Sequence, residues 1–162
     1  MIVVSDTSPL NYLVLIDAIE ILPKLFLEVH APTQVMVELN RRRTPEAVRQ
    51  WALTPPEWLH VSTPLTTLAS SIDLDLGEAQ AISLANELGA KAILIDERKG
   101  RRVAEQQGLD VVGTLTVLEF AAERNLLQLR PALDSLRQTT FYITDDYIAA
   151  ALARDAARKG RS

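Results

Sequence analysis

Two hydrophobic patterns alternate along the chain. Short continuous apolar runs predict strands that are buried on both faces. Between them lie longer segments with apolar residues every three or four positions, which predict amphipathic helices. The predicted strands are 2–4, 29–30, 58–61, 92–95 and 109–112, and the main predicted helices are 10–26 in two pieces, 32–43, 45–53, 77–88, 98–107, 114–121, 131–136 and 145–157. Residues 65–72 predict a weak helix or a loop. This alternation predicts an α/β sandwich with a mostly parallel sheet.

The segment 75–102 shows the pattern most clearly. Gly89 follows the helical segment 77–88, where a left-handed residue commonly ends a helix. The apolar run 92–95 comes next and stops abruptly at Asp96 and Glu97. Because open parallel sheets bind ligands at the carboxyl ends of their strands, Asp96 is a candidate site residue.

Composition narrows the chemistry of a site. The chain has 162 residues, no cysteine and two histidines, which excludes thiolate sites and disfavours histidine-rich metal sites. This length fits a single domain over 1–162, with a mobile tail at about 158–162. The formal net charge of −4 argues mildly against nucleic-acid binding, unless a divalent cation neutralises phosphate. We find neither a signal peptide nor a stretch that could span a membrane, so we expect a cytoplasmic protein.

Asp6 repeats the pattern of Asp96, because it follows the apolar run 2–4. The structural alternative is that Asp6 or Ser8 caps the next helix, with Pro9 in its first turn. Since Ser8 can fill the capping role, Asp6 is free to act in a site.

Glu38 and Glu78 are two further candidates, each with a structural alternative. Glu38 borders the apolar face of its helix, but Arg41 and Arg42 stand where an ion pair is expected. Glu78 lies on the core side of its helix, yet with Asp75 it also forms the sequence of a capping box. Capping and metal binding could share this turn.

Four carboxylates from four elements favour metal-dependent chemistry. Clustered carboxylates disfavour one another's ionised forms unless a cation is present. Oxygen ligands without cysteine or histidine favour Mg²⁺ or Mn²⁺. Such ions support hydrolysis of phosphodiesters by activating water and stabilising the leaving oxygen.

Four motifs in this order resemble those of a PIN-domain protein: VSDTSPL, VMVEL, LGEAQAISLA and LIDERKGRRVAEQQGLDVVGTL. They are similar to the VapC-like branch of small prokaryotic PIN proteins. The resemblance implies a PIN-like three-layer sandwich, with a mostly parallel five-stranded sheet flanked by helices. It also implies a Mg²⁺- or Mn²⁺-dependent endoribonuclease, a toxin inhibited by a small antitoxin, and a homodimer.

Carried over by position, the resemblance assigns the catalytic and metal-binding roles to Asp6, Glu38, Glu78 and Asp96. Many members have aspartate in place of Glu78. The fourth motif here lacks its usual threonine and aromatic residue, so Glu97 could share or replace the role of Asp96.

The candidate substrate contacts surround these carboxylates. By resemblance, Thr7 would position substrate or metal-bound water. Among the basic clusters 41–43 and 99–102, we expect Arg42, Lys99 and Arg101 to contact RNA.

A different class of function remains open. A catalytically silent PIN-like module that binds RNA or a protein would share this fold, and failure to bind Mn²⁺ would favour it. A phosphatase that uses Asp6 as nucleophile is set aside, because its second aspartate would stand at position 8, which is Ser8.

Overall fold

The computed structural model describes residues 1–68 and 74–160 of the chain. At its centre is a five-stranded sheet in which every pairing is parallel, with the strand order β3-β2-β1-β4-β5. The strands are β1 (Ile2–Ser5), β2 (Glu28–Pro32), β3 (Leu59–Ser62), β4 (Ala92–Leu94) and β5 (Asp110–Val112). The predicted α/β class and the parallel sheet are confirmed.

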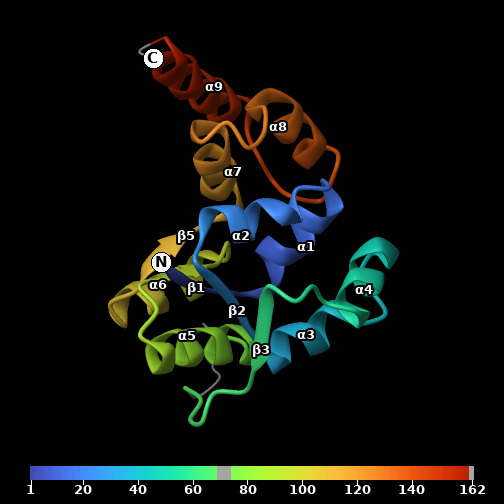
Figure 1. Ribbon diagram of the computed structural model, residues 1–162, viewed down its shortest axis with the longest axis vertical. Helices are drawn as coiled ribbons and strands as arrows, with labels where there is room; N and C mark the ends of the chain where they lie inside the picture. The colour runs from blue at the N-terminus through green and yellow to red at the C-terminus, as the bar shows by residue number, and fades with distance from the viewer. Residues whose placement is uncertain (69–73, 161–162) are drawn as a thin grey trace.

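Helices cover both faces of this sheet (Figure 1). They are α1 (Thr7–Leu15), the short 3₁₀ helix η1 (Ile19–Ile21), α2 (Leu22–Leu25), α3 (Thr33–Leu39), α4 (Glu46–Leu53), α5 (Leu76–Leu88), α6 (Arg98–Gln106), α7 (Thr114–Glu123), α8 (Leu129–Arg137) and α9 (Asp145–Lys159). Figure 1 shows α7, α8 and α9 stacked at one end of the molecule, with the C-terminus at its tip.

Alternate residues of the central strands enter two separate cores, as the two-residue period of a strand requires. Val3 and Leu94 belong to the larger cluster, which α1, α7 and their neighbours complete. Val4 and Ile93 face the other way, into the smaller cluster with α5 and α6. The result is three layers, with apolar surface on both faces of β1 and β4.

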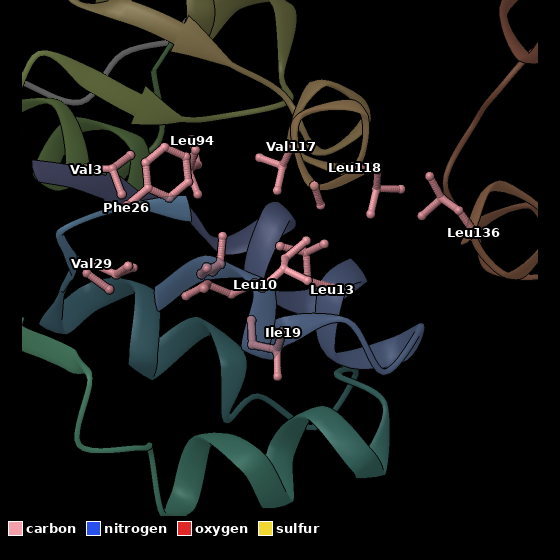
Figure 2. Packing of buried hydrophobic residues seen from close by; sticks show 14 of the residues in the cluster. Val3, Leu10, Leu13, Ile19, Phe26, Val29, Leu94, Val117, Leu118 and Leu136 are labelled. Carbon is pink, nitrogen blue, oxygen red and sulfur yellow. The ribbon is translucent and has the colours of Figure 1, made fainter. Parts of the chain in front are cut away.

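The larger core joins the sheet to the helical end of the molecule. Figure 2 shows Leu10 and Leu13 of α1 close to Val117 and Leu118 of α7. All four side chains are fully buried. This packing fixes the start of α1, and with it the end of β1, against the rest of the chain.

Several predicted boundaries need correction. The segment predicted as two helical pieces is three, α1, η1 and α2, and the chain turns at Asp17, which has a positive φ of 58°. The helix predicted over 32–43 ends at Leu39, so the three arginines that follow lie in a turn. Residues 65–68 form no helix, and 69–73 lie outside the described residues.

The C-terminal elements also extend beyond their predicted limits. α8 begins at Leu129 and ends at Arg137. α9 reaches Lys159, inside the stretch that we expected to be mobile, and residues 161–162 are not described. Among the described helices, none has both the length and the apolar character needed to cross a membrane.

Candidate active site

Asp6 lies at the end of the central strand. Its backbone N–H donates to the carbonyl oxygen of Leu94 at 2.8 Å, which continues the pairing of β1 with β4. Asp6 occupies the N-cap position of α1, but its side chain makes no capping hydrogen bond. Ser8 is not the cap that the sequence suggested, because α1 already begins at Thr7. The side chain of Asp6 is therefore left for another role.

The Asp6 carboxyl group is buried, with 6% of the residue exposed. In the part of the chain that the structure describes, its Oδ1 atom has no hydrogen-bond partner. A buried carboxylate oxygen without a partner is costly, so its presence needs an explanation.

The two carboxylate oxygens of Glu78 have different surroundings. The capping box predicted from the sequence is present: the Glu78 N–H donates to Asp75 Oδ1 at 2.8 Å, and the Asp75 N–H donates to Glu78 Oε1 at 3.0 Å. The other oxygen, Oε2, is buried and has no partner among the described residues. Glu78 is 4% exposed. One oxygen caps α5 while the second is available.

Glu38 comes to the same place from α3. The hydroxyl of Thr7 donates to its Oε2 atom. The carboxylate also lies against the backbone of Gly77, where a Cβ atom would come within 2.6 Å of Oε1 and 2.7 Å of Oε2. Within residues 1–68 and 74–160, no ion pair joins Glu38 to Arg41 or Arg42. The structural alternative for Glu38 is thus not observed.

The surroundings of Asp6 disfavour its ionisation. Burial raises the pKa of Asp6 well above its usual value, although the backbone N–H of Thr7 opposes the shift. The negative charges of Glu78, Asp75 and Glu38 raise that pKa further. The charge of each neighbour is therefore felt at Asp6, as expected of a site that is complete only with a cation.

Glu78 shows the same behaviour. Burial raises its pKa from 4.5 to about 7, and the backbone N–H of Asp75 opposes this shift. The charges of Asp75, Glu97 and Glu38 add to the increase. A glutamate with a pKa near neutrality at the end of a sheet is a candidate functional group.

Asp96 is held differently. Its Oδ1 accepts from the Thr114 N–H at 2.8 Å, and its Oδ2 accepts from the Thr114 hydroxyl at 2.7 Å. The strand register explains the pairing: Leu94 lies opposite Val112, so Asp96 and Thr114 follow at equal distances. Both carboxylate oxygens already have partners.

The charges that act on Asp96 differ as well. Burial raises the pKa of this carboxyl group. The two hydrogen bonds from Thr114 and the positive charge of Arg101 oppose the increase. The acidic groups that raise the pKa of Asp6 are not among these influences.

Glu97, the second acidic residue after β4, faces the other carboxylates more directly. It is exposed and caps α6, where its side chain accepts from the Lys99 N–H at 3.4 Å. Its charge contributes to the raised pKa of Glu78. In α6, Gly100 lies so close to Glu78 that a Cβ atom there would overlap its carboxylate and would come within 2.7 Å of Ile95 Cδ1.

The structure thus brings Asp6, Glu38 and Glu78 together and places Asp96 beside Thr114. As the side chains lie, no group of three or more acidic or histidine residues in the described ranges is placed to hold one metal ion. The donor chemistry nevertheless suits Mg²⁺ or Mn²⁺, because the two unpartnered buried atoms of Asp6 and Glu78 are carboxylate oxygens.

Sequence reasoning missed three contributors to this arrangement. Asp75 was identified only as a cap, although its charge acts on both Asp6 and Glu78. Thr114 is the second residue after β5, just as Asp96 is the second residue after β4, and this signal is visible in the sequence once the two strands are paired. Gly77 admits the carboxylate of Glu38, and only the tertiary packing reveals that contact.

A cleft of about 1010 Å³ begins at Thr7 and Glu38. Arg41 and Arg43 line it, and the predicted RNA contact Arg42 is not among the lining residues. A smaller pocket of about 470 Å³ lies beside Asp96 and includes Arg101, another predicted contact. The third, Lys99, lies in the first turn of α6 and is exposed.

Comparison with known proteins identifies the fold family. A family model described as DUF3368, a PIN domain, matches residues 2–156. No curated protein and no solved structure gives a significant match. The matched range includes all five strands and every carboxylate discussed above, and the chain therefore belongs to this family of PIN domains.

Proposed function

We propose that this protein is a metal-dependent endoribonuclease that hydrolyses phosphodiester bonds in RNA. One observation carries the proposal: two buried carboxylate oxygens, Asp6 Oδ1 and Glu78 Oε2, have no partner among the described residues. They lie in a PIN domain, a family whose members are typically metal-dependent nucleases. A divalent cation would remove the cost of burying these oxygens together.

The proposed roles follow from the contacts of each residue. Asp6 and Glu78 would hold Mg²⁺ or Mn²⁺ through their unpartnered oxygens, and Glu38 would complete the site. Thr7 orients Glu38 by donating its hydroxyl hydrogen to the carboxylate. When bound, the ion would supply an activated water and would stabilise the leaving oxygen.

The two acidic residues after β4 divide their roles in this proposal. Glu97 is the better candidate for a further ligand, because its charge acts on Glu78. Asp96 instead holds the start of α7 through its two hydrogen bonds with Thr114. Lys99 and Arg101 are proposed RNA contacts at this side of the site.

The resemblance to the VapC-like branch extends the proposal to the biological setting. The ribonuclease would be the toxin of a toxin–antitoxin pair, inhibited by a small antitoxin protein and assembled as a homodimer. Co-expression with the product of an adjacent gene and size measurement of the purified complex would test this assignment.

Mn²⁺ titration by calorimetry tests the site directly. We expect the wild-type protein to bind Mn²⁺, and Asp6→Asn and Glu78→Gln to lose that binding. Asp134→Asn, which changes an exposed acid of α8, should bind as the wild type does. RNA incubated with the wild-type protein should be cleaved with Mn²⁺ and left intact with EDTA.

A second function is favoured by one specific observation. The described residues contain no ready-made cluster of three metal-ligating side chains. A catalytically silent module that binds RNA or a protein would be consistent with this geometry. Absence of Mn²⁺ binding by the wild-type protein, even with an RNA oligonucleotide present, would contradict the nuclease proposal and support the module.

A further inference from the structure

The cleft of about 1010 Å³ has two unlike walls. One wall is the turn after α3, which contributes Arg41, Arg43 and Thr44. The other wall includes the segment 138–140 that follows α8. The residues between them include Asn11 and Tyr12 of α1. The cleft therefore reaches from Thr7 and Glu38 of the candidate site to the end of α8.

The arginine wall is fixed to the candidate site. The Arg41 N–H donates to the carbonyl oxygen of Glu38 at 3.2 Å, and the Thr44 hydroxyl donates to the same oxygen at 3.1 Å. The turn itself is closed by a hydrogen bond from the Thr44 N–H to the Arg41 carbonyl oxygen at 3.0 Å. Arg41 and Arg43 line the cleft, whereas Arg42 between them is not a lining residue.

These arginines stand out against the charge of the whole molecule. The chain carries a net charge of −4, so it offers polyanions little general attraction. Both arginines are exposed at the mouth of the cleft, and within the described residues no carboxylate forms an ion pair with either. Two such guanidinium groups beside a phosphodiesterase site suit the phosphates that flank the scissile bond.

The wall formed by residues 138–140 is polar and held in place. The Tyr12 hydroxyl and the Thr140 hydroxyl are 2.9 Å apart, and the ring of Tyr12 meets Phe141 edge-on with centroids 5.0 Å apart. The Thr139 hydroxyl donates to Leu136 at 2.6 Å and accepts from the Phe141 N–H at 3.1 Å. Gln138 is exposed beside this anchored segment and brings an amide that can both donate and accept.

We propose that this cleft holds a single-stranded segment of RNA next to the cleavage point. Its phosphates lie against Arg41 and Arg43, and its bases and ribose hydroxyls meet the wall formed by Asn11 and residues 138–140. The inference rests on the proposed ribonuclease function. It assigns substrate selection to the end of α8, an element that contributes no carboxylate to the site.

Single strands suit the cleft for a chemical reason. Base edges and ribose hydroxyls that are not paired can meet side-chain amides and hydroxyls directly. A cleft lined both by such groups and by two cations matches the bases and the phosphates of an extended strand. An extended acidic peptide has the same negative charges but lacks the groups that the polar wall would recognise.

The test is fluorescence anisotropy with a labelled single-stranded RNA oligonucleotide, measured in EDTA so that binding is separated from cleavage. Replacing both Arg41 and Arg43 by alanine should weaken binding about tenfold at low salt. The slope of log affinity against log salt should fall by about 1.4, because each lost phosphate contact contributes roughly 0.7. Gln138→Ala should change the preference among RNA sequences and leave the salt slope unchanged.

Arg42→Ala is the matched control, because it removes the same charge from the same turn outside the cleft lining. Arg42→Ala should reduce the slope of log affinity against log salt by less than half as much as Arg41→Ala or Arg43→Ala does alone. Equal effects of all three arginine substitutions, or wild-type binding by the double variant, would overturn the proposal. An acidic peptide that binds with equal affinity and the same dependence on Arg41 and Arg43 would instead assign the cleft to a protein.

The same experiment separates this inference from the proposed function. RNA binding that depends on Arg41 and Arg43 without any cleavage in Mn²⁺ would contradict the nuclease and support the cleft. If the double variant still binds RNA like the wild type and cleaves it in Mn²⁺, the result would support the nuclease and contradict the proposed role of the cleft.

Discussion

Asp6 and Asp96 end neighbouring strands, follow similar apolar runs and are candidates for the same task, yet their surroundings are opposite. Both oxygens of Asp96 accept hydrogen bonds from Thr114, and Arg101 adds a positive charge. Asp6 is buried among other carboxyl groups, and its Oδ1 atom lacks a partner within the described residues. A similar position in the sequence has produced one satisfied carboxylate and one unsatisfied carboxylate.

The adjacent strand explains the difference. β4 lies between β1 and β5, and the second residue after β5 is Thr114, whose hydroxyl donates to Asp96. β1 lies between β2 and β4, and the helices that approach its end bring Glu38 and Glu78 instead. A carboxylate at the end of a strand is therefore available for a ligand only where the neighbouring elements bring no donor to it.

The largest expected effect concerns metal affinity. Asp6→Asn should reduce Mn²⁺ affinity and RNA cleavage by more than about 100-fold, beyond the loss typical of residues that only support a ligand. Asp96→Asn should reduce both by less than about tenfold, since its carboxylate is committed to Thr114. Calorimetry and a cleavage assay on the two variants provide the comparison. Equal losses would show that Asp96 turns away from Thr114 and joins the metal site.

For the free energy of unfolding we expect the reverse order, with a larger loss from substituting Asp96 than from substituting Asp6. Asp96→Ala leaves the N–H and the hydroxyl of Thr114 without their acceptor, so we expect a loss of about 2 kcal/mol in the free energy of unfolding. That loss corresponds to a fall of about 5 °C in Tm for a chain of this size. Asp6→Asn should leave Tm unchanged or raise it in EDTA, because it removes a buried charge.

A double-mutant cycle with Thr114→Val controls for other effects of the Asp96 substitution. The two changes should cost less together than the sum of their separate costs, because each removes the same hydroxyl–carboxylate contact. Additive costs would mean that the side-chain contact between Asp96 and Thr114 does not stabilise the protein.

Stability should also depend on pH in a direction set by Glu78. Its pKa in the folded protein is about 7, against a usual value of 4.5, so the folded state binds more protons between these values. The stabilisation is fully present below pH 4.5 and is lost as the pH rises through 7. In EDTA, Tm should therefore fall by several degrees between pH 5 and pH 8.

The variant Glu78→Gln and the addition of Mn²⁺ test this pH dependence further. Glu78→Gln should flatten the pH dependence of Tm, and Mn²⁺ at pH 8 should restore stability in the wild-type protein only. A wild-type Tm that rises steadily from pH 5 to pH 8 in EDTA would contradict the raised pKa of Glu78.

The smallest expected effect on Mn²⁺ affinity comes from replacing two glycines, one beside Glu38 and one beside Asp96. Gly77→Ala places a Cβ atom 2.6 Å from Glu38 Oε1, so the carboxylate must move, and Mn²⁺ affinity should fall severalfold. Gly113→Ala approaches Asp96 Oδ1 at 3.1 Å and should leave Mn²⁺ affinity unchanged. Calorimetry on both variants distinguishes them, and a loss at Gly113 equal to that at Gly77 would place both carboxylates in one site.

Much of the fold was predictable because local chemistry determines it. The apolar runs of β1 and β4, the left-handed Gly89 with φ 67° and the capping box at Asp75 all follow from neighbouring residues. The end of α3 was not predictable in this way. Arginines favour helices, but here the turn closed by Thr44 stops the helix at Leu39.

The candidate site was predictable only in its membership. The sequence identified Asp6, Glu38 and Glu78 because each interrupts an apolar pattern. It did not distinguish Asp96 from them, because the deciding contact comes from Thr114, eighteen residues further on. Which cationic residues line the cleft depends on the orientation of a turn, and alternating patterns carry no information about that orientation.

The strand order has a consequence for how the chain reaches its active form. β1 is synthesised first but lies at the centre of the sheet, and its partner β4 is about ninety residues away in the chain, with Val3 opposite Ala92. The whole stretch between β1 and β4 must therefore be synthesised before that edge of β1 is covered, and until then the edge is exposed to other chains. Glu38 and Glu78 lie within the same stretch, so the three carboxylates can come together only after α5 has been synthesised.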